Sequence, residues 1–212
     1  MIAHTDSSLQ PALDALALPG VVIGHRVISL GDENALLPEE APAFAASVVK
    51  VRRASGAARI VARELLTRLG ERECALPRSP SGAPIWPKGI VGSLAHDAAV
   101  AVAAVAMNRD VAALGIDVEP AEVLPPDLLE IVATPGELRK IGDDPYRGRL
   151  LFVAKEAVYK AVHPLDRTFL DHHDVEVDLA DRKAVVRNGR TVDLRFCVST
   201  HLVVLALLRQ PR

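Results

Sequence analysis

The sequence has little of what marks several large classes of protein. It holds only two cysteines, Cys74 and Cys197, among 212 residues, and their spacing matches neither a disulfide framework nor a set of metal ligands. A reducing, cytoplasmic setting is the simplest interpretation. The longest apolar runs fall far short of the roughly 20 residues that span a bilayer, and the first residues lack a basic stretch followed by an apolar core. We therefore expect neither a membrane segment nor an export signal.

The chain also lacks a surplus of positive charge. Its formal net charge is −2, which argues against a general nucleic-acid-binding protein but leaves room for a local basic pocket. No Walker loop, no G-x-G-x-x-G and no G-x-S-x-G occurs, so the common nucleotide-binding folds and the serine hydrolases are not indicated. Aromatic residues make up only 3% of the chain, but half of the residues are apolar, which is ample for a packed core.

What is present is a succession of strand-like runs and two long amphipathic helices. At roughly 100–200 residues per domain, the length predicts one large domain or two small lobes. Pro- and Gly-rich residues 77–92 predict an ordered loop, and the R-N-G-R run at 187–190 predicts a hairpin turn. We expect helices at 48–70, 126–132, 135–142 and 147–163, and strands at 21–30, 93–106, 112–120, 172–180, 183–198 and 200–208.

One internal echo indicates how these elements are grouped. Residues 92–105 and 197–208 each place a serine and then a histidine ahead of a long apolar strand. Each segment also follows a helix that carries arginine or lysine. The echo predicts two related lobes, each a helix packed on a small sheet. We place them at residues 1–109 and 110–212, acting as one functional unit.

The motif G-I-D-V-E-P at 115–120 carries two carboxylates. Alternate residues of a strand share a face, so Asp117 and Glu119 project to one side and Val118 is buried on the other. Two neighbouring carboxylates repel one another unless a positive group lies between them, and Mg²⁺ commonly takes one or two carboxylates together with substrate phosphates. The competing interpretation is an acidic strand end that faces water.

The helix at 147–163 carries Lys155, Glu156 and Lys160 at the edge of its apolar stripe. The plain interpretation is a solvated face, on which Glu156 and Lys160 form an i,i+4 pair worth ~0.2–0.5 kcal/mol. The alternative is that Glu156 completes a metal site or acts as a general base. The lysines would then neutralise phosphate oxygens as point charges.

Further cationic groups lie upstream, namely Arg52, Arg59, Arg78 and His96. Guanidinium groups match phosphate oxygens well, so together these residues favour a ligand rich in phosphates. Taken singly, an arginine on a helix usually faces solvent and His96 could cap a strand. The adjacent pair at 172–173 is not expected to bind a metal, because neighbouring side chains point apart.

Taken together, these motifs resemble a known family. The pattern G-[IV]-D-x-E followed by [FW]-x-x-K-E-x-x-x-K, here "GIDVE" and "FVAKEAVYK", resembles the 4′-phosphopantetheinyl transferases. The resemblance is to the branch of the siderophore-synthesis enzymes, similar to enterobactin synthetase component D, and their actinobacterial relatives. It extends in order over about residues 50–175, through "VRRASGAARIVARELLTRLG", "GAPIWPKGIVGSLAHD" and "YKAVHPLDRTFL".

The resemblance implies an α+β fold of two pseudo-symmetric lobes with the site at their interface. It implies transfer of 4′-phosphopantetheine from coenzyme A to a serine of an acyl, peptidyl or aryl carrier protein, with release of adenosine 3′,5′-bisphosphate. The pathway served would be polyketide, nonribosomal-peptide, siderophore or fatty-acid synthesis, by a cytoplasmic monomer that needs neither nucleic acid nor a membrane.

The resemblance also implies roles for single residues. Asp117, Glu119 and Glu156 would hold Mg²⁺, and Glu156 would help to deprotonate the acceptor serine. The expected coenzyme A contacts are Lys155 and Lys160 at the diphosphate, and Arg52, Arg59, Arg78 and His96 mainly at the adenosine-end phosphates.

The chain departs from the family pattern in three places. The helix is one residue shorter between Arg52 and Arg59 and lacks the usual aromatic there, and Ala95 stands where a hydroxyl residue is common. Asp97 beside His96 is expected to raise the pKa of the histidine.

Two other functions remain open at this point. One is a non-catalytic protein that binds coenzyme A or a carrier protein, against which the three retained carboxylates argue. The other is a metal-dependent phosphohydrolase.

Overall fold

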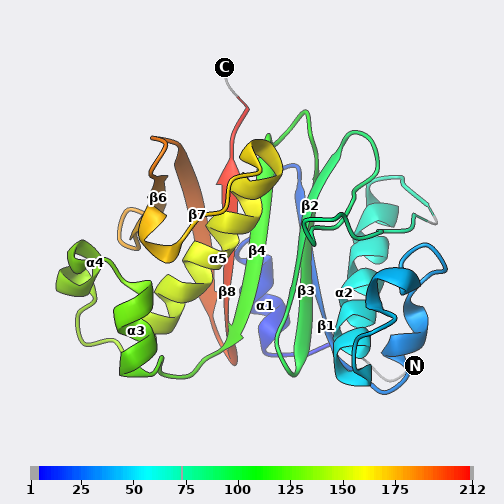
Figure 1. The fold of residues 1–212 in the computed structure, drawn as a ribbon, viewed down its shortest axis with the longest axis horizontal. Coiled ribbons are helices and arrows are strands. Elements are labelled where there is room, and N and C mark those ends of the chain that lie inside the picture. The colour runs from blue at the N-terminus through cyan, green and yellow to red at the C-terminus, as the bar shows by residue number, and fades with distance from the viewer. Residues whose placement is uncertain (1–4, 73, 211–212) are drawn as a thin grey trace.

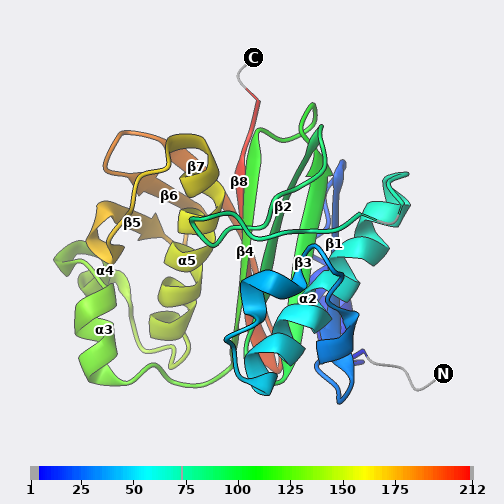
Figure 2. The same ribbon diagram turned by 45° about the vertical axis from the view of Figure 1, so that its right-hand side comes forward.

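The computed structural model describes residues 5–72 and 74–210. Residues 1–4, on which the expectation about export partly depends, lie outside the described residues. Figures 1 and 2 show two lobes side by side, each with a long helix packed against a β-sheet. Within the described ranges, no helix is both long and apolar enough to cross a membrane.

The N-terminal lobe contains a three-stranded antiparallel sheet in the order β1–β3–β2. The helix α2 (Val49–Arg68) packs against it, and its alanine-rich face lies on β3. The sheet and its flanking short helices are β1 (Val21–Val27), β2 (Ile90–His96), β3 (Val100–Met107), η1 (Asp32–Ala35) and η2 (Ala41–Phe44).

The prediction of a single strand at 93–106 is wrong, because the structure divides this segment into β2 and β3. The turn between them is made by Asp97, whose Oδ1 accepts hydrogen bonds of 2.7 Å from the backbone N–H groups of Ala99 and Val100. Asp readily forms turns of this kind with its own backbone. A chain reversal is difficult to predict within a run of small apolar residues, because the same pattern also fits one long strand.

The C-terminal lobe contains a five-stranded antiparallel sheet in the order β4–β8–β7–β6–β5. The helix α5 (Arg147–Asp166) lies across β4 and β8. The R-N-G-R hairpin turn is confirmed between β6 and β7, with Gly189 at a φ of 83°. The other elements are β4 (Ala113–Pro120), α3 (Pro126–Val132), α4 (Pro135–Lys140), η3 (His172–Asp174), β5 (Val175–Asp178), β6 (Lys183–Val186), β7 (Thr191–Val198) and β8 (His201–Leu208).

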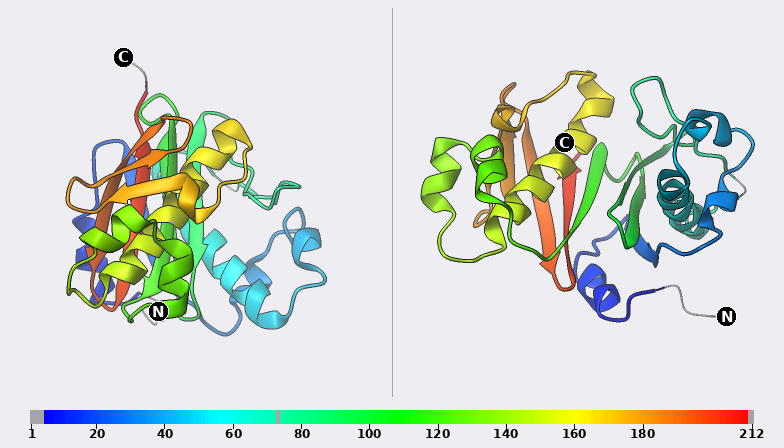
Figure 3. Two further views of the ribbon diagram at one scale, coloured as in Figure 1. Left: turned by 60° about the vertical axis from the view of Figure 1, so that its left-hand side comes forward. Right: turned by 60° about the horizontal axis from the view of Figure 1, so that its bottom comes forward.

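A shared apolar core joins the lobes. Side chains of β3 pack against the face of β4 and β8 that points away from α5. The short helix α1 (Leu9–Asp14) buries Leu13 in this core, and the right panel of Figure 3 shows it beneath the junction, on the side opposite α5. The weak pattern of residues 1–20 did not predict this helix.

The two-lobed α+β fold is thus confirmed, and the two echoing segments form corresponding features. Residues 92–105 cover most of the hairpin β2–β3, and residues 197–208 cover the end of β7, the turn and all of β8. In Figure 2 the loop of residues 77–89, between α2 and β2, crosses from the N-terminal lobe toward α5. The lobes therefore meet along β2, β4, α5 and this loop.

Candidate active site

The strand β4 places its two carboxylates on one face, as its alternation predicted, and this face is turned toward α5. Ile116 and Val118 are almost fully buried in the core between the lobes. Asp117 and Glu119 lie on the opposite face and contact side chains of α5. Asp117 is buried, whereas Glu119 is half-buried.

Gly115 allows α5 to lie unusually close to this strand. A Cβ atom at Gly115 would collide with the carbonyl oxygen of Ala157 and would lie 2.6 Å from the backbone nitrogen of Ala161. Only a residue without a side chain permits that approach. The glycine of the G-I-D-V-E motif therefore brings the helix within reach of the carboxylates.

Each carboxylate of β4 has its own cation on α5. Lys160 Nζ lies 2.7 Å from Asp117 Oδ1, and Arg149 Nη1 lies 2.9 Å from Glu119 Oε2. Sequence reasoning missed Arg149. A signal was available, because Arg149, Glu156 and Lys160 follow one another at helical spacings of seven and four residues and so share a face of α5.

The surroundings of Asp117 and Glu119 raise the pKa of both carboxyl groups, which makes the charged form less favourable. Burial raises the pKa of Asp117, and the hydrogen-bonded Lys160 offsets only part of this effect. Burial also raises the pKa of Glu119, and the charge of Asp117 raises it further, against the opposing effect of Arg149. Two oxygen donors that destabilise one another suit a hard divalent cation, since Mg²⁺ commonly uses one or two carboxylates plus substrate phosphates.

The third predicted metal ligand is not gathered with these two. Glu156 Oε1 lies 3.3 Å from His172 Nε2. Within the described part of the chain, no group of three or more His, Cys, Asp or Glu side chains is arranged to hold a metal ion. The i,i+4 ion pair between Glu156 and Lys160 is not formed either, because each residue has another partner.

Lys155 is directed away from these groups. Its side chain is 1% exposed, and Nζ donates hydrogen bonds to Glu137 Oε2 at 2.7 Å and to the carbonyl oxygens of Val132 and His172 at 2.8 Å each. Burial lowers the pKa of Lys155, and Glu137 opposes the change. All three donors of the ammonium group are thus used inside the C-terminal lobe.

Two adjoining pockets, each of about 330 Å³, lie where the lobes meet and share Arg78 and Lys160. The first is lined by hydrogen-bond donors from both lobes, with Arg59 and the imidazole of His96 beside the shared pair. The second includes Glu156. The structure therefore brings five predicted residues to the pockets. Asp117 is next to them, because it is hydrogen-bonded to Lys160.

The arginines of the first pocket differ in how much freedom they retain. Arg59 is 4% exposed and donates to the carbonyl oxygens of Leu76 and Ser55 at 3.1 and 3.2 Å. Arg78 is exposed and makes a hydrogen bond from Nε to Gly82 O. Both guanidinium groups stack on the ring of Phe44, at 4.7 Å for Arg59 and 5.6 Å for Arg78. Sequence reasoning missed this aromatic residue, which comes from η2.

His96 differs from the expectation for its pKa. Desolvation lowers the pKa of His96, and the charge of Lys160 adds to this effect. The hydrogen bond and the charge of Asp97 act to raise this pKa but do not outweigh desolvation. The Asp97 carboxylate itself lies 3.0 Å from Nε2 of His201 in the C-terminal lobe and also binds the turn backbone. The predicted rise is therefore wrong, because desolvation of the imidazole outweighs the raising effects of Asp97.

Arg52 is not brought to the pockets. It lies in the first turn of α2, and its Nη1 donates to the carbonyl oxygen of Ser47 at 2.6 Å. It is not among the described residues that line either pocket.

Comparison with known proteins agrees with this arrangement. Residues 39–106 match the family described as the 4′-phosphopantetheinyl transferase N-terminal domain, and residues 113–206 match the 4′-phosphopantetheinyl transferase superfamily. The two matches fall on the two lobes.

Three curated relatives carry the same name. The chain is 37% identical to the 4′-phosphopantetheinyl transferase Npt of Nocardia iowensis, over 81% of this chain and 80% of Npt. It is 39% identical to PptT of Mycobacterium tuberculosis over 66% of this chain and 64% of PptT. It is 40% identical to Svp of Streptomyces mobaraensis over 67% of this chain and 60% of Svp. The chain belongs to the 4′-phosphopantetheinyl transferase superfamily, a family of enzymes that transfer phosphopantetheine to carrier proteins.

Proposed function

We propose that this chain transfers 4′-phosphopantetheine from coenzyme A to a serine of an acyl, peptidyl or aryl carrier protein in a Mg²⁺-dependent reaction. The observation that carries the proposal is the position of Lys160, which lies in both pockets at the lobe junction and 2.7 Å from the buried carboxylate of Asp117. A phosphate-binding cation and a candidate metal ligand thus meet where substrate would enter.

Coenzyme A is held through its phosphates in this proposal. Arg78 and His96 contact the adenosine-end phosphates in the first pocket, and Lys160 neutralises the diphosphate at the boundary with the second. Arg59 also lines this pocket, and the N–H groups that it does not use within the protein are offered to the phosphates. The support is that these groups line one cavity and that Arg78 is exposed there.

Asp117 and Glu119 are the proposed metal-binding pair, with Glu156 near the metal. A bound Mg²⁺ supplies charge neutralisation for the diphosphate during phosphoryl transfer. The two raised pKa values fit this role, because both carboxylates gain from a nearby positive charge.

The reaction proceeds by attack of the serine hydroxyl on the β-phosphate of coenzyme A. A bond forms between the serine oxygen and phosphorus, the phosphorus–oxygen bond of the diphosphate breaks, and adenosine 3′,5′-bisphosphate leaves. Glu156, on the wall of the second pocket, helps to remove the serine proton directly or through water. Positioning and charge neutralisation supply most of the rate.

The proposed coenzyme A contacts do not include Lys155, whose three donors are used inside the C-terminal lobe. They do not include Arg52 either, which is not among the described residues that line the two pockets. Residues 1–109 and 110–212 act as one unit in the proposal, and the working form is a cytoplasmic monomer. Polyketide, nonribosomal-peptide, siderophore and fatty-acid carrier proteins are the proposed acceptors.

Intact mass spectrometry of apo carrier proteins tests the proposal. Incubation with the chain, coenzyme A and Mg²⁺ should add the mass of phosphopantetheine, and Asp117→Ala or Glu119→Ala should remove most of the transfer while the circular dichroism spectrum stays unchanged. Release of phosphopantetheine without a carrier would instead identify a phosphohydrolase. Tight coenzyme A binding with no transfer to any carrier would identify a binding protein.

A further inference from the structure

Two consecutive residues of α5 hold the same residue of η3. Lys155 Nζ donates a hydrogen bond of 2.8 Å to the carbonyl oxygen of His172. Glu156 Oε1 lies 3.3 Å from Nε2 of the same histidine. One residue thus binds the main chain of His172 and the next contacts its ring.

The main-chain side of this arrangement is rigid. Lys155 is tied to Glu137, which is 5% exposed and also accepts hydrogen bonds of 2.7 Å from the backbone N–H groups of Thr134 and Val177. The lysine therefore connects α4, β5 and η3 to α5 through buried, charge-assisted bonds, which are short and directional.

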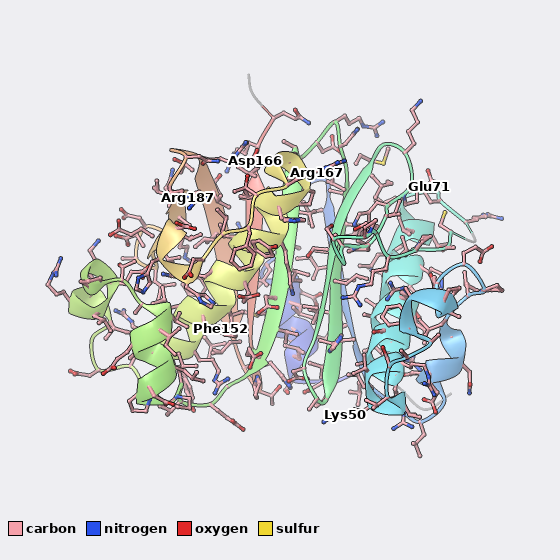
Figure 4. The ribbon with its side chains drawn as sticks, in the orientation of Figure 1. Lys50, Glu71, Phe152, Asp166, Arg167 and Arg187 are labelled. Atoms are coloured by element: carbon pink, nitrogen blue, oxygen red, sulfur yellow. The ribbon has the colours of Figure 1, made fainter. Side chains whose placement is uncertain are left out.

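The ring side is confined as well. The ring of His172 packs against Phe152 with centroids 5.8 Å apart, and Figure 4 labels Phe152 on α5. Nε2 of His172 is shielded from solvent and makes no well-aligned hydrogen bond within the described part of the chain. The carboxylate of Glu156 is the acceptor next to it, so the two side chains are coupled.

We propose that Lys155 and His172 are positioning residues for Glu156. Lys155 fixes η3 through the carbonyl oxygen of His172, and the ring of His172 then holds the Glu156 carboxylate at the wall of the second pocket. The inference rests on the proposed function, because it takes Glu156 to act in transfer. It also gives Lys155 a role other than contact with the diphosphate.

His172 variants test the ring. His172→Phe keeps an aromatic ring against Phe152 and removes the nitrogen, so kcat should fall on the order of ten- to a hundred-fold, as small misplacements of reacting groups do. The Kd for coenzyme A, measured by calorimetry, should change less than about two-fold. His172→Gln places an amide N–H near Nε2 and should recover most of kcat. A normal kcat in His172→Phe would overturn the proposal.

A double-variant comparison separates positioning from general structural support. If His172 acts through Glu156, adding His172→Phe to Glu156→Gln should lower kcat no further. Multiplicative losses would overturn the inference, because they show independent action. Normal turnover of Glu156→Gln alone would instead contradict the proposed function.

A Lys155 variant needs a second substitution, because loss of the ammonium group alone would leave the buried carboxylate of Glu137 without its partner. Lys155→Met combined with Glu137→Gln removes both charges and keeps similar volumes. This pair should lower kcat and leave the Kd for coenzyme A within about two-fold of the wild type. A rise of ten-fold or more in that Kd would show that Lys155 binds the substrate and would overturn its assigned role.

Discussion

Lys160 of α5 and Asp117 of β4 form a hydrogen-bonded ion pair of 2.7 Å at the junction of the two lobes. The carboxylate is buried, whereas the lysine side chain is 30% exposed. The same ammonium group lies 3.4 Å from the carbonyl oxygens of Leu94 in β2 and Ile116 in β4. Lys160 thus links both sheets to the pockets, so the proposed function predicts that a change at this one helix position affects both binding and transfer.

Replacing Lys160 should weaken coenzyme A binding as well as transfer. A charge-assisted hydrogen bond contributes ~1.5–3 kcal/mol, so Lys160→Ala should raise the Kd roughly ten-fold or more in calorimetry. Lys160→Arg should recover only part, because a planar fork replaces a compact point charge. Lys140→Ala is the matched control, since Lys140 pairs with Asp178 on the surface. Equal effects of Lys160→Ala and Lys140→Ala would contradict the assignment.

Arg78 should distinguish coenzyme A from dephospho-coenzyme A. Its guanidinium group is exposed in the first pocket, so we expect Arg78→Ala to weaken coenzyme A binding roughly ten-fold or more. Binding of dephospho-coenzyme A should change little, because the 3′-phosphate is missing. Arg68→Ala, on the exposed last turn of α2, serves as control. Equal weakening of both ligands would show that Arg78 does not bind the 3′-phosphate.

Asp97 should make stability depend on pH. Burial raises the pKa of Asp97, but hydrogen bonds from His201 and from the N–H groups of Val100 and Ala99 outweigh it, so the net pKa is lowered. A lowered pKa stabilises the fold above the unfolded value of about 3.9, and this stabilisation is lost as the pH falls through the folded value.

Asp97→Asn should therefore lower the free energy of unfolding at pH 7 by about 1.5–3 kcal/mol. Urea unfolding between pH 7 and pH 3 should show that the difference from the wild type shrinks below about pH 4. A difference that stays constant over this range would mean that the charge of Asp97 is not the cause.

Gly115→Ala should destabilise the C-terminal lobe. The added Cβ meets the backbone of α5 at Ala157 and Ala161, and overpacking of this kind typically costs ~1–3 kcal/mol. For a chain of this length each kcal/mol lowers Tm by about 2–4 °C. Gly136→Ala in α4 is the control, because the nearest atoms to its Cβ would be side-chain atoms and not backbone, the closest being the flexible end of Glu176 at 2.9 Å. A melting temperature equal to that of the control would refute the close approach.

Much of the fold could be predicted from local sequence. The helix α2 ends where Gly70 adopts a φ of 92°, and β4 alternates as its motif indicates. These features depend on residues a few positions apart, which the chain order shows directly. The turn at Asp97 and the helix α1 escaped prediction, because a small apolar run hides a reversal and a short helix depends on the core it joins.

The candidate site, like the fold, has features that the local sequence predicts and features that only the tertiary structure decides. The residue types and spacings of G-I-D-V-E and K-E-x-x-x-K, by themselves, indicated the family, placed Asp117 and Glu119 on one strand face and placed Lys160 at the edge of a helix stripe. Only the tertiary structure decided that Arg149 pairs with Glu119, that Asp97 binds His201, and that Lys155 turns into the C-terminal lobe. The physical reason is that a charged side chain at the edge of a helix stripe has several partners within reach. Packing of segments distant in sequence selects the one that leaves no charge buried alone.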